Sequence, residues 1–265
     1  MTMVHAAAPA HGDLRGGWAR GVLRLLAIPL WTGACWLVWL LVGLGPGGGG
    51  RREGMVRAWA RGLTRLLGIE VERVGSAPAR PFLLVTNHLS YLDVVVLMTL
   101  VDAVFVAKQE VRAWPMFGPL ARIIGTIFID RESARDAVRV GNEVSRELES
   151  GRGVILFAEG TSSDGTQVLP LRPALFEAAA RAGREVHVAS LSYHTDPGGP
   201  GAAQVLCWWG DMTFLPHLAG VCRLRRSRVR VAFGDRPITA ADRRTLATEL
   251  HLALMECFTP SGHDY

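Results

Sequence analysis

Short apolar blocks alternate with helical periodicity along most of the chain. Apolar runs bounded by turn residues predict strands over residues 82–86, 103–107, 125–130, 154–158, 186–192, 205–209 and 228–233. Helical spacing predicts helices over residues 93–100, 134–149, 173–182 and 240–258. Such alternation is typical of an α/β domain with a largely parallel sheet flanked by helices. We expect this domain to span residues 75–259, followed by a tail at residues 260–265.

The N-terminal part has a different pattern. Residues 25–44 contain no charged side chain, and ~20 such residues suffice to cross the hydrocarbon layer of a membrane. Residues 52–68 then place apolar side chains on one face and arginines on the other, which is typical of a helix in the headgroup layer of an anionic membrane. We therefore expect a flexible segment at residues 1–17, and a membrane segment plus a basic amphipathic helix at residues 18–74.

Arginines flank the apolar run on both sides, and more of them lie on its C-terminal side. A spanning helix would then have its C-terminal side in the cytoplasm. Pro29 and the glycine-rich break at residues 43–50 are equally compatible with a re-entrant hairpin whose two ends are cytoplasmic. The sequence leaves both arrangements open.

The composition of the chain indicates which classes of molecule it binds. The chain has 265 residues, a net charge of +5 and a pI near 9.5, which suits anionic partners such as lipid headgroups or nucleic acid. Few aromatic residues accompany the basic run at residues 223–230, so we do not expect nucleic-acid binding. The four cysteines are scattered without metal-ligand spacing, which predicts a reducing compartment and no structural metal.

The segment Asn87-His88-Leu89-Ser90-Tyr91-Leu92-Asp93 follows the first predicted strand. On a straight helix, side chains five residues apart point ~140° away from each other, so His88 and Asp93 meet only if the chain turns between them. A carboxylate bonded to one imidazole nitrogen leaves the other free to take a proton from an alcohol. The alternative is structural, because Ser90 and Asp93 also fit a helix-capping pattern.

A second strand end carries Arg131. Its guanidinium suits a pair of phosphate oxygens. The alternative is a loop residue ahead of a helix that Ser133 and Asp136 cap.

A third strand end carries the polar glycine loop Glu159-Gly160-Thr161. Its backbone N–H groups and hydroxyls suit a polar headgroup, although an ordinary strand-to-helix turn has a similar composition. Arg172 then stands at a predicted helix N-terminus and is a further candidate anion contact.

Together, these motifs resemble those of the membrane-bound glycerolipid acyltransferases, typified by lysophosphatidic acid acyltransferase. His88 and Asp93 match the family's H-x4-D motif, and residues 125–131 look like its second motif, including the arginine. Phe157 and the Glu159-Gly160-Thr161 loop match its F-P-E-G-T block, with Ala158 in place of the proline. Residues 186–193 look like its fourth, apolar motif.

The resemblance implies an O-acyltransferase that moves a fatty acyl group from acyl-CoA or acyl carrier protein to the free hydroxyl of a lysophospholipid, foremost 1-acylglycerol-3-phosphate, giving phosphatidic acid. It implies that His88 is the general base, that Asp93 orients it, and that neither a metal nor a cofactor takes part. It implies the bacterial inner membrane as location, with the catalytic domain on the cytoplasmic face and membrane lipids around it. The acceptor contacts it implies are Arg131, Glu159, Gly160, Thr161 and Arg172.

Departures from the family pattern keep alternatives open. The loop at residues 159–165 looks like a bacterial branch whose acceptors include lyso-ornithine lipid, so that lipid or another lysolipid is a second candidate acceptor. An inactive membrane-surface lipid-binding protein is an alternative of another class. The intact His88 and Asp93 argue against it, because a binding protein needs no base. A thioesterase is a third alternative and would release free fatty acid without an acceptor.

Overall fold

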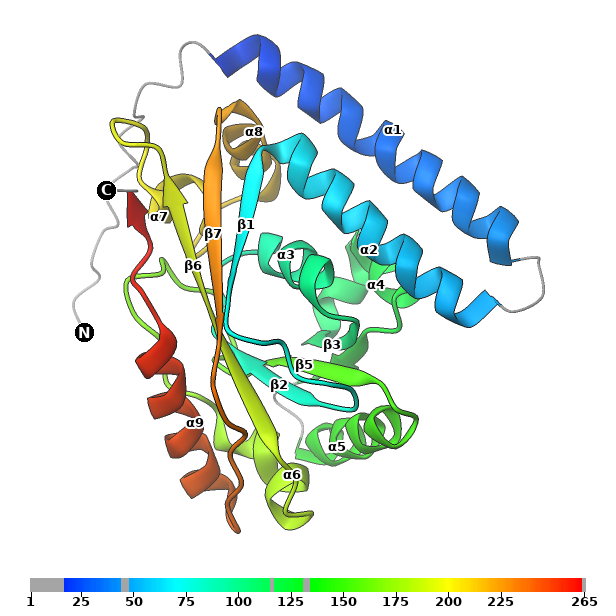
Figure 1. Cartoon of the computed structure of the whole chain (residues 1–265), viewed down its shortest axis with the longest axis vertical. Helices are drawn as coiled ribbons and strands as arrows, with labels where there is room; N and C mark the ends of the chain where they lie inside the picture. Colours follow the sequence, from blue (N-terminus) through cyan, green and yellow to red (C-terminus); the bar gives the residue numbers. More distant parts are fainter. Residues whose placement is uncertain (1–16, 44–47, 115–116, 131–133, 264–265) are drawn as a thin grey trace.

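A computed structural model describes residues 17–43, 48–114, 117–130 and 134–263. Its centre is an eight-stranded sheet in the order β1-β7-β6-β2-β5-β3-β4, with β8 paired to β6 (Figure 1). Among the described pairings between these strands, that of β6 with β7 is antiparallel and the others are parallel, so the expected largely parallel sheet is confirmed. The strands are β1 Ile69–Val74, β2 Leu83–Thr86, β3 Ala103–Lys108, β4 Ile127–Ile129, β5 Gly153–Phe157, β6 Val186–Thr195, β7 Ser227–Phe233 and β8 Gly262–His263.

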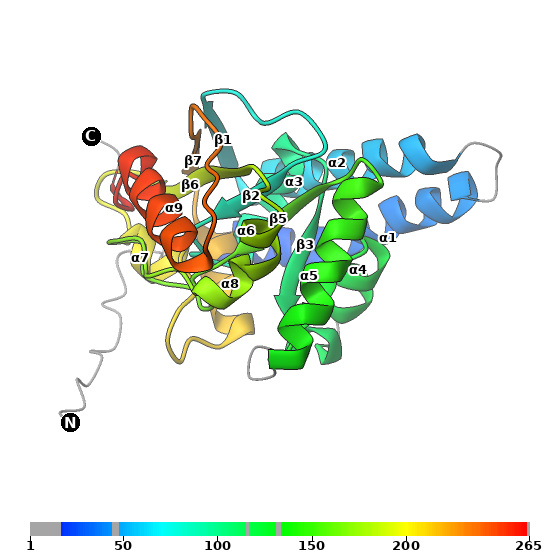
Figure 2. The same ribbon diagram turned by 90° about the horizontal axis from the view of Figure 1, so that it is seen from below.

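Helices cover both faces of the sheet (Figures 1 and 2). Residues of α2, α3 and α8 pack on one face, and residues of α5, α6 and α9 pack on the other. Strands β2 and β5 are buried along their whole length, as expected for parallel strands covered on both sides. The helices are α1 Trp18–Gly43, α2 Gly48–Leu67, α3 Leu92–Leu100, α4 Phe117–Ile123, α5 Ala134–Glu149, α6 Glu177–Arg181, α7 Ala202–Val205, α8 Phe214–Arg223 and α9 Arg243–Cys257, with 3₁₀ turns η2 Gln109–Ala113 and η3 Pro173–Phe176.

The strand predicted over residues 205–209 is wrong. Val205 ends the short helix α7, and the next amides turn back, with Cys207 N donating to Ala202 O at 3.0 Å. Trp208 N then donates to Leu89 O at 2.7 Å, which ties this loop to the turn after β2. A short apolar run does not distinguish a strand from a buried helix end or loop.

Two strands, β1 and β8, and three helices, α4, α7 and α8, lie where the sequence predicts no such element. β1 forms a sheet edge beside β7, within the stretch assigned to the membrane part, and β8 pairs with β6 within the expected tail. The buried face of helix α8 packs in the core cluster that also contains residues of β6 and β7.

Helix α1 lies beside α2 at one flank of the molecule and also contacts α8 (Figures 1 and 2). Within the described residues it is the one helix long and apolar enough to cross a membrane. Side-chain hydrogen bonds attach the part of this helix up to Thr32 to the rest of the domain. Arg24 Nη1 donates to Leu224 O at 2.6 Å, Trp31 Nε1 donates to Trp59 O at 3.1 Å, and Trp59 Nε1 donates to Thr32 Oγ1 at 3.2 Å.

Candidate active site

The turn after β2 brings His88 and Asp93 together. His88 leaves the carboxyl end of the strand, and Asp93 lies in the first turn of α3. His88 Nδ1 lies 2.8 Å from Asp93 Oδ2, so the chain does turn between them as expected. The same oxygen accepts the backbone N–H groups of Leu89 at 2.7 Å and Ser90 at 3.0 Å.

The capping alternative is half present. The Asp93 carboxylate accepts backbone N–H groups as a capping carboxylate does, but Ser90 makes no side-chain cap. The Ser90 hydroxyl is buried and has no hydrogen-bond partner within the described residues. Asp93 thus combines a helix-start role with a bond to the imidazole, whereas Ser90 contributes only its backbone.

The His88 ring is held on two sides and open on a third. It stacks on Phe157, with ring centroids 4.2 Å apart and an interplanar angle of 27°. Its side chain is 24% exposed, whereas that of Asp93 is fully buried. Within the described residues His88 Nε2 has no hydrogen-bond partner, and the ring lines a cavity of about 600 Å³. This nitrogen is therefore available to a molecule in the cavity.

The cavity is lined mostly by apolar side chains from several elements. Gly160 and Thr161 contribute to its wall beside His88. The exposed Lys108 and Glu110 lie where β3 ends, and both also line it. The apolar wall includes Ile28, Pro29, Trp59, Leu63, Leu67, Leu92, Val95, Met98, Phe105, Leu120, Ile124, Trp208, Trp209 and Phe214.

Glu159 faces the protein backbone. Its Oε2 accepts the His88 N–H at 3.0 Å, and its Oε1 accepts the Leu169 N–H at 2.8 Å. Burial raises the pKa of Glu159 to about 7, although these two backbone hydrogen bonds act in the opposite direction. Glu159 does not line the cavity, so its carboxylate holds the loop that carries His88.

The backbone conformation at position 160 requires a glycine. Its φ of +82° lies in the left-handed region, and an added Cβ would lie 2.8 Å from Arg172 Cζ. Arg172 packs its guanidinium there while its backbone N donates to Ala158 O at 2.9 Å. Arg172 is exposed beside the loop but outside the cavity wall, and Arg131 lies outside the described residues.

Two polar residues near the pair lie within the sequence motifs but are not among the predicted site residues. Asn87 extends the β2–β6 ladder: its Nδ2 donates to Leu191 O at 3.0 Å and its Oδ1 accepts the Leu191 N–H at 2.7 Å. The Tyr193 hydroxyl donates to Asp93 Oδ1 at 2.7 Å. Their motifs mark both positions, but the partners of the two side chains depend on the packing of β2 against β6.

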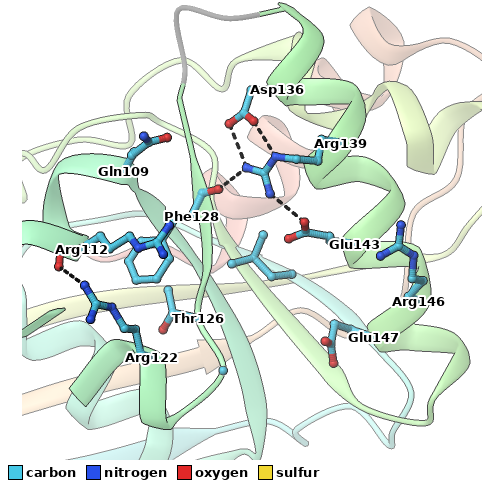
Figure 3. A pocket seen from close by; sticks show the side chains of 12 residues that line it. Gln109, Arg112, Arg122, Thr126, Phe128, Asp136, Arg139, Glu143, Arg146 and Glu147 are labelled. Carbon is cyan, nitrogen blue, oxygen red and sulfur yellow. Dashed lines mark hydrogen bonds and ion pairs between the residues drawn. The ribbon is translucent and has the colours of Figure 1, made fainter. Parts of the chain in front are cut away.

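A second pocket, of about 670 Å³, lies between β4 and α5 (Figure 3). Arg139 dominates it and bonds to Asp136, to Glu143 and to the backbone oxygen of Phe128. These carboxylates raise the pKa of Arg139, which stays charged and compensated. Thr126 lines both pockets, so this cleft borders the cavity of His88.

Comparisons with known proteins agree with one another. A family model described as Acyltransferase matches residues 68–194. The chain is 40% identical to the lyso-ornithine lipid O-acyltransferase of Rhizobium meliloti (strain 1021), over 69% of this chain and 67% of that protein. It is 35% identical to the 1-acyl-sn-glycerol-3-phosphate acyltransferase of Neisseria gonorrhoeae, over 56% of this chain and 58% of that protein.

The fold is similar to that of a solved structure. The crystal structure of the 1-acyl-sn-glycerophosphate acyltransferase of Thermotoga maritima matches with a TM-score of 0.59 at 18% identity. The match covers 89% of this chain and 97% of that chain. The sheet and its helices are therefore an arrangement that a known enzyme shares.

The raised pKa of Glu159 predicts a pH-dependent stability. Its folded pKa of about 7 exceeds the ordinary glutamate pKa of 4.5, so the folded state binds the proton more tightly. This binding stabilises the protein fully below pH 4.5, and the contribution is lost as pH rises through about 7. Relative to Glu159→Gln, the wild type is expected to lose on the order of 3 kcal/mol over that range.

Thermal unfolding in detergent at a series of pH values measures this difference. Glu149→Gln, at an exposed position on α5, provides the matched control and is expected to follow the wild-type curve. Parallel curves for the wild type and Glu159→Gln would contradict the assignment.

Proposed function

The chain belongs to the family of lysophospholipid and 1-acylglycerol-3-phosphate acyltransferases, and from this premise we propose that it acylates the free hydroxyl of a lysolipid with His88 as general base. One observation carries the assignment of the base. Asp93 holds Nδ1 of the imidazole, while Nε2 is unpartnered within the described residues and belongs to a ring that lines an apolar cavity. An alcohol and a fatty chain can meet a base there.

The chemistry follows from this geometry. His88 Nε2 removes the proton of the acceptor hydroxyl as its oxygen attacks the carbonyl carbon of an acyl thioester. The tetrahedral intermediate collapses by breaking the carbon–sulfur bond, and the imidazolium returns the proton to the thiolate. The products are the ester and the free thiol of coenzyme A or acyl carrier protein. Positioning within the cavity supplies much of the remaining acceleration.

The loop after β5 supports the acceptor. We assign Gly160 and Thr161 to direct contact, because both line the cavity beside His88. Arg172, exposed next to Gly160, and Arg131, beyond β4, remain proposed contacts for an anionic headgroup. We expected Glu159 to contact the acceptor, but both of its oxygens accept backbone N–H groups, so we propose that it supports the loop instead.

Two observations favour lyso-ornithine lipid as the first acceptor. The Rhizobium relative matches 69% of this chain, whereas the Neisseria relative matches 56%. The exposed Lys108 and Glu110 also offer one charge of each sign at the cavity. An ornithine headgroup carries both a carboxylate and an ammonium group and suits this pair, whereas a phosphate would be repelled by Glu110. 1-Acylglycerol-3-phosphate is the second candidate.

We also propose that α1 lies in the cytoplasmic leaflet of the inner membrane without spanning it. Hydrogen bonds from Arg24 and Trp31 and to Thr32 attach the part of the helix up to Thr32 to the domain. The residues from 33 to 43 extend only about 16 Å, which is short of the ~30 Å hydrocarbon layer. The exposed apolar residues along α1 include Trp18, Leu23, Leu26, Leu30, Leu37 and Leu41.

The first prediction concerns the base. His88→Ala is expected to lower acyl transfer by roughly 10²- to 10⁴-fold, because the attacking hydroxyl then keeps its proton. Purified protein, a lysolipid panel and both acyl-CoA and acyl carrier protein as donors give the measurement. His251→Ala, on α9 at the opposite face of the sheet, is the matched control and should retain activity. Release of free fatty acid without an acceptor would instead indicate a thioesterase, and lipid binding without transfer would indicate a binding protein.

The acceptor assignment gives a second prediction. Glu110→Gln is expected to raise KM for lyso-ornithine lipid roughly two- to fivefold, since an exposed ion pair is lost. The same variant should leave KM for 1-acylglycerol-3-phosphate unchanged or lower, because a like charge is removed. Initial rates in mixed micelles measure both. Equal changes for the two acceptors would refute a role for Glu110 in headgroup selection.

Membrane topology gives a third prediction. Cysteines introduced as Ala19→Cys at the start of α1 and Gly54→Cys in α2 are both exposed. In right-side-out spheroplasts, a membrane-impermeant maleimide should label neither until the cells are lysed, with the wild-type cysteines as background. Labelling of Ala19→Cys alone in intact spheroplasts would mean that α1 spans the bilayer.

A further inference from the structure

The two oxygens of the Asp93 carboxylate have different partners. Oδ2 receives the imidazole of His88 and two backbone N–H groups. Oδ1 has one partner within the described residues, the hydroxyl of Tyr193 at 2.7 Å. Asp93 is fully buried, so water does not replace a missing donor at Oδ1. The orientation of the carboxylate therefore depends on Tyr193.

Tyr193 is a rigid donor. It is fully buried in β6, where its residue pairs with Val229 of β7 and its backbone N donates to Ser261 Oγ at 3.0 Å. Two residues earlier, Leu191 is bound on both its N–H and its C=O by the side chain of Asn87. Since Asn87 directly precedes His88, these two hydrogen bonds hold β6, which carries the Tyr193 hydroxyl, against the turn that carries His88.

We propose that Tyr193 is a positioning residue for acyl transfer, whose hydroxyl fixes the Asp93 carboxylate and through it aims the His88 imidazole at the acceptor. The inference rests on the proposed function. It adds a residue of β6, which contains the fourth, apolar motif, to the residues that act in catalysis. Tyr193 touches neither the cavity nor the reacting atoms. A charge-assisted O–H···O⁻ bond is strong and directional, so its loss leaves a buried carboxylate oxygen without a donor.

The Tyr193 hydroxyl also affects how strongly the Asp93 carboxylate attracts the His88 imidazolium. By stabilising the carboxylate, it makes Asp93 a weaker partner for the imidazolium form of His88, so its removal strengthens the attraction between the carboxylate and the imidazolium. Three other titratable groups face this cluster: Glu159 from the β5 loop, Tyr91 ahead of α3, and Cys207 after α7. Burial raises the pKa values of the Tyr91 and Cys207 groups, which stay neutral over the working range, whereas Glu159 titrates near pH 7.

Tyr193→Phe tests the proposal by removing one oxygen atom. We expect kcat to fall roughly 10- to 100-fold with little change in KM, because the base is misdirected while the cavity is intact. The acidic limb of the pH profile of kcat should move to higher pH by roughly half a unit or more. A mere loss of stability moves neither the split between kcat and KM nor the pH profile.

Ser190→Ala is the matched control. Ser190 is also buried in β6, but its hydroxyl donates to Cys257 O at 2.7 Å, away from the candidate base. It removes a buried hydroxyl of the same strand and should leave kcat and the pH profile as in the wild type. A Tyr193→Phe protein that behaves like Ser190→Ala would overturn the proposal.

A second variant covers a Tyr193→Phe protein that does not fold. Site-specific 3-fluorotyrosine at position 193 keeps the hydroxyl and the shape but makes the phenol a stronger donor. The acidic limb should then move to lower pH, opposite to the effect of phenylalanine. An unmoved limb, or one moved to higher pH, would overturn the proposal.

One measurement is independent of turnover. Nuclear magnetic resonance titration of the His88 ring in the full chain should give a higher pKa in Tyr193→Phe than in the wild type, and a lower one with 3-fluorotyrosine. This readout holds even if the lysolipid panel yields no acyl transfer, so it separates a failure of the positioning role from a failure of the proposed function. An unchanged His88 titration in both variants would end the proposal.

Discussion

The site depends on one buried carboxylate, that of Asp93. A carboxylate without water is tolerated only if its oxygens are hydrogen bonded, because desolvating an unpaired charge costs several kcal/mol or more. Asp93 has four donors: the His88 imidazole, the N–H groups of Leu89 and Ser90, and the Tyr193 hydroxyl. The donors come from the turn after β2 and from β6, so satisfying the charge also fixes the turn, the helix start and the ring.

The parallel sheet makes this convergence possible. β2 pairs with β5 on one side and β6 on the other, and all three run in the same direction. Their carboxyl ends therefore meet at one edge, where β2 delivers His88 and β5 delivers Glu159. β6 runs further along this edge, so that Tyr193 reaches Asp93. Glu159 and Asn87 then join neighbouring strand ends through backbone groups, a type of bond that depends on sheet register.

Patterns in the sequence predicted the features that depend on residues close together in the chain. The turn between His88 and Asp93, the α/β alternation and most strands follow from spacing alone. The bond from Tyr193 to Asp93 joins residues 100 positions apart, and no local pattern carries that distance. The sequence identifies Glu159 as a polar residue of a glycine loop. Whether its carboxylate binds a headgroup or backbone N–H groups depends on tertiary packing, which the sequence does not show. The wrong strand over residues 205–209 has the same origin, because an apolar run reports burial and not conformation.

Helix α1 and the candidate base share one cavity. Ile28 and Pro29 of α1 and Trp59 of α2 line the same space as His88. Moving a fatty chain through water costs about 0.8 kcal/mol per methylene, so a long chain would need more than ~10 kcal/mol to reach a base surrounded by solvent. In the proposed membrane arrangement, a cavity that begins at α1 removes this cost, because apolar contact then continues from the lipid to the imidazole. Under the proposed function, the docking of α1 through Arg24 and Trp31 serves catalysis as well as anchoring, since a helix that left the domain would open the wall of the cavity.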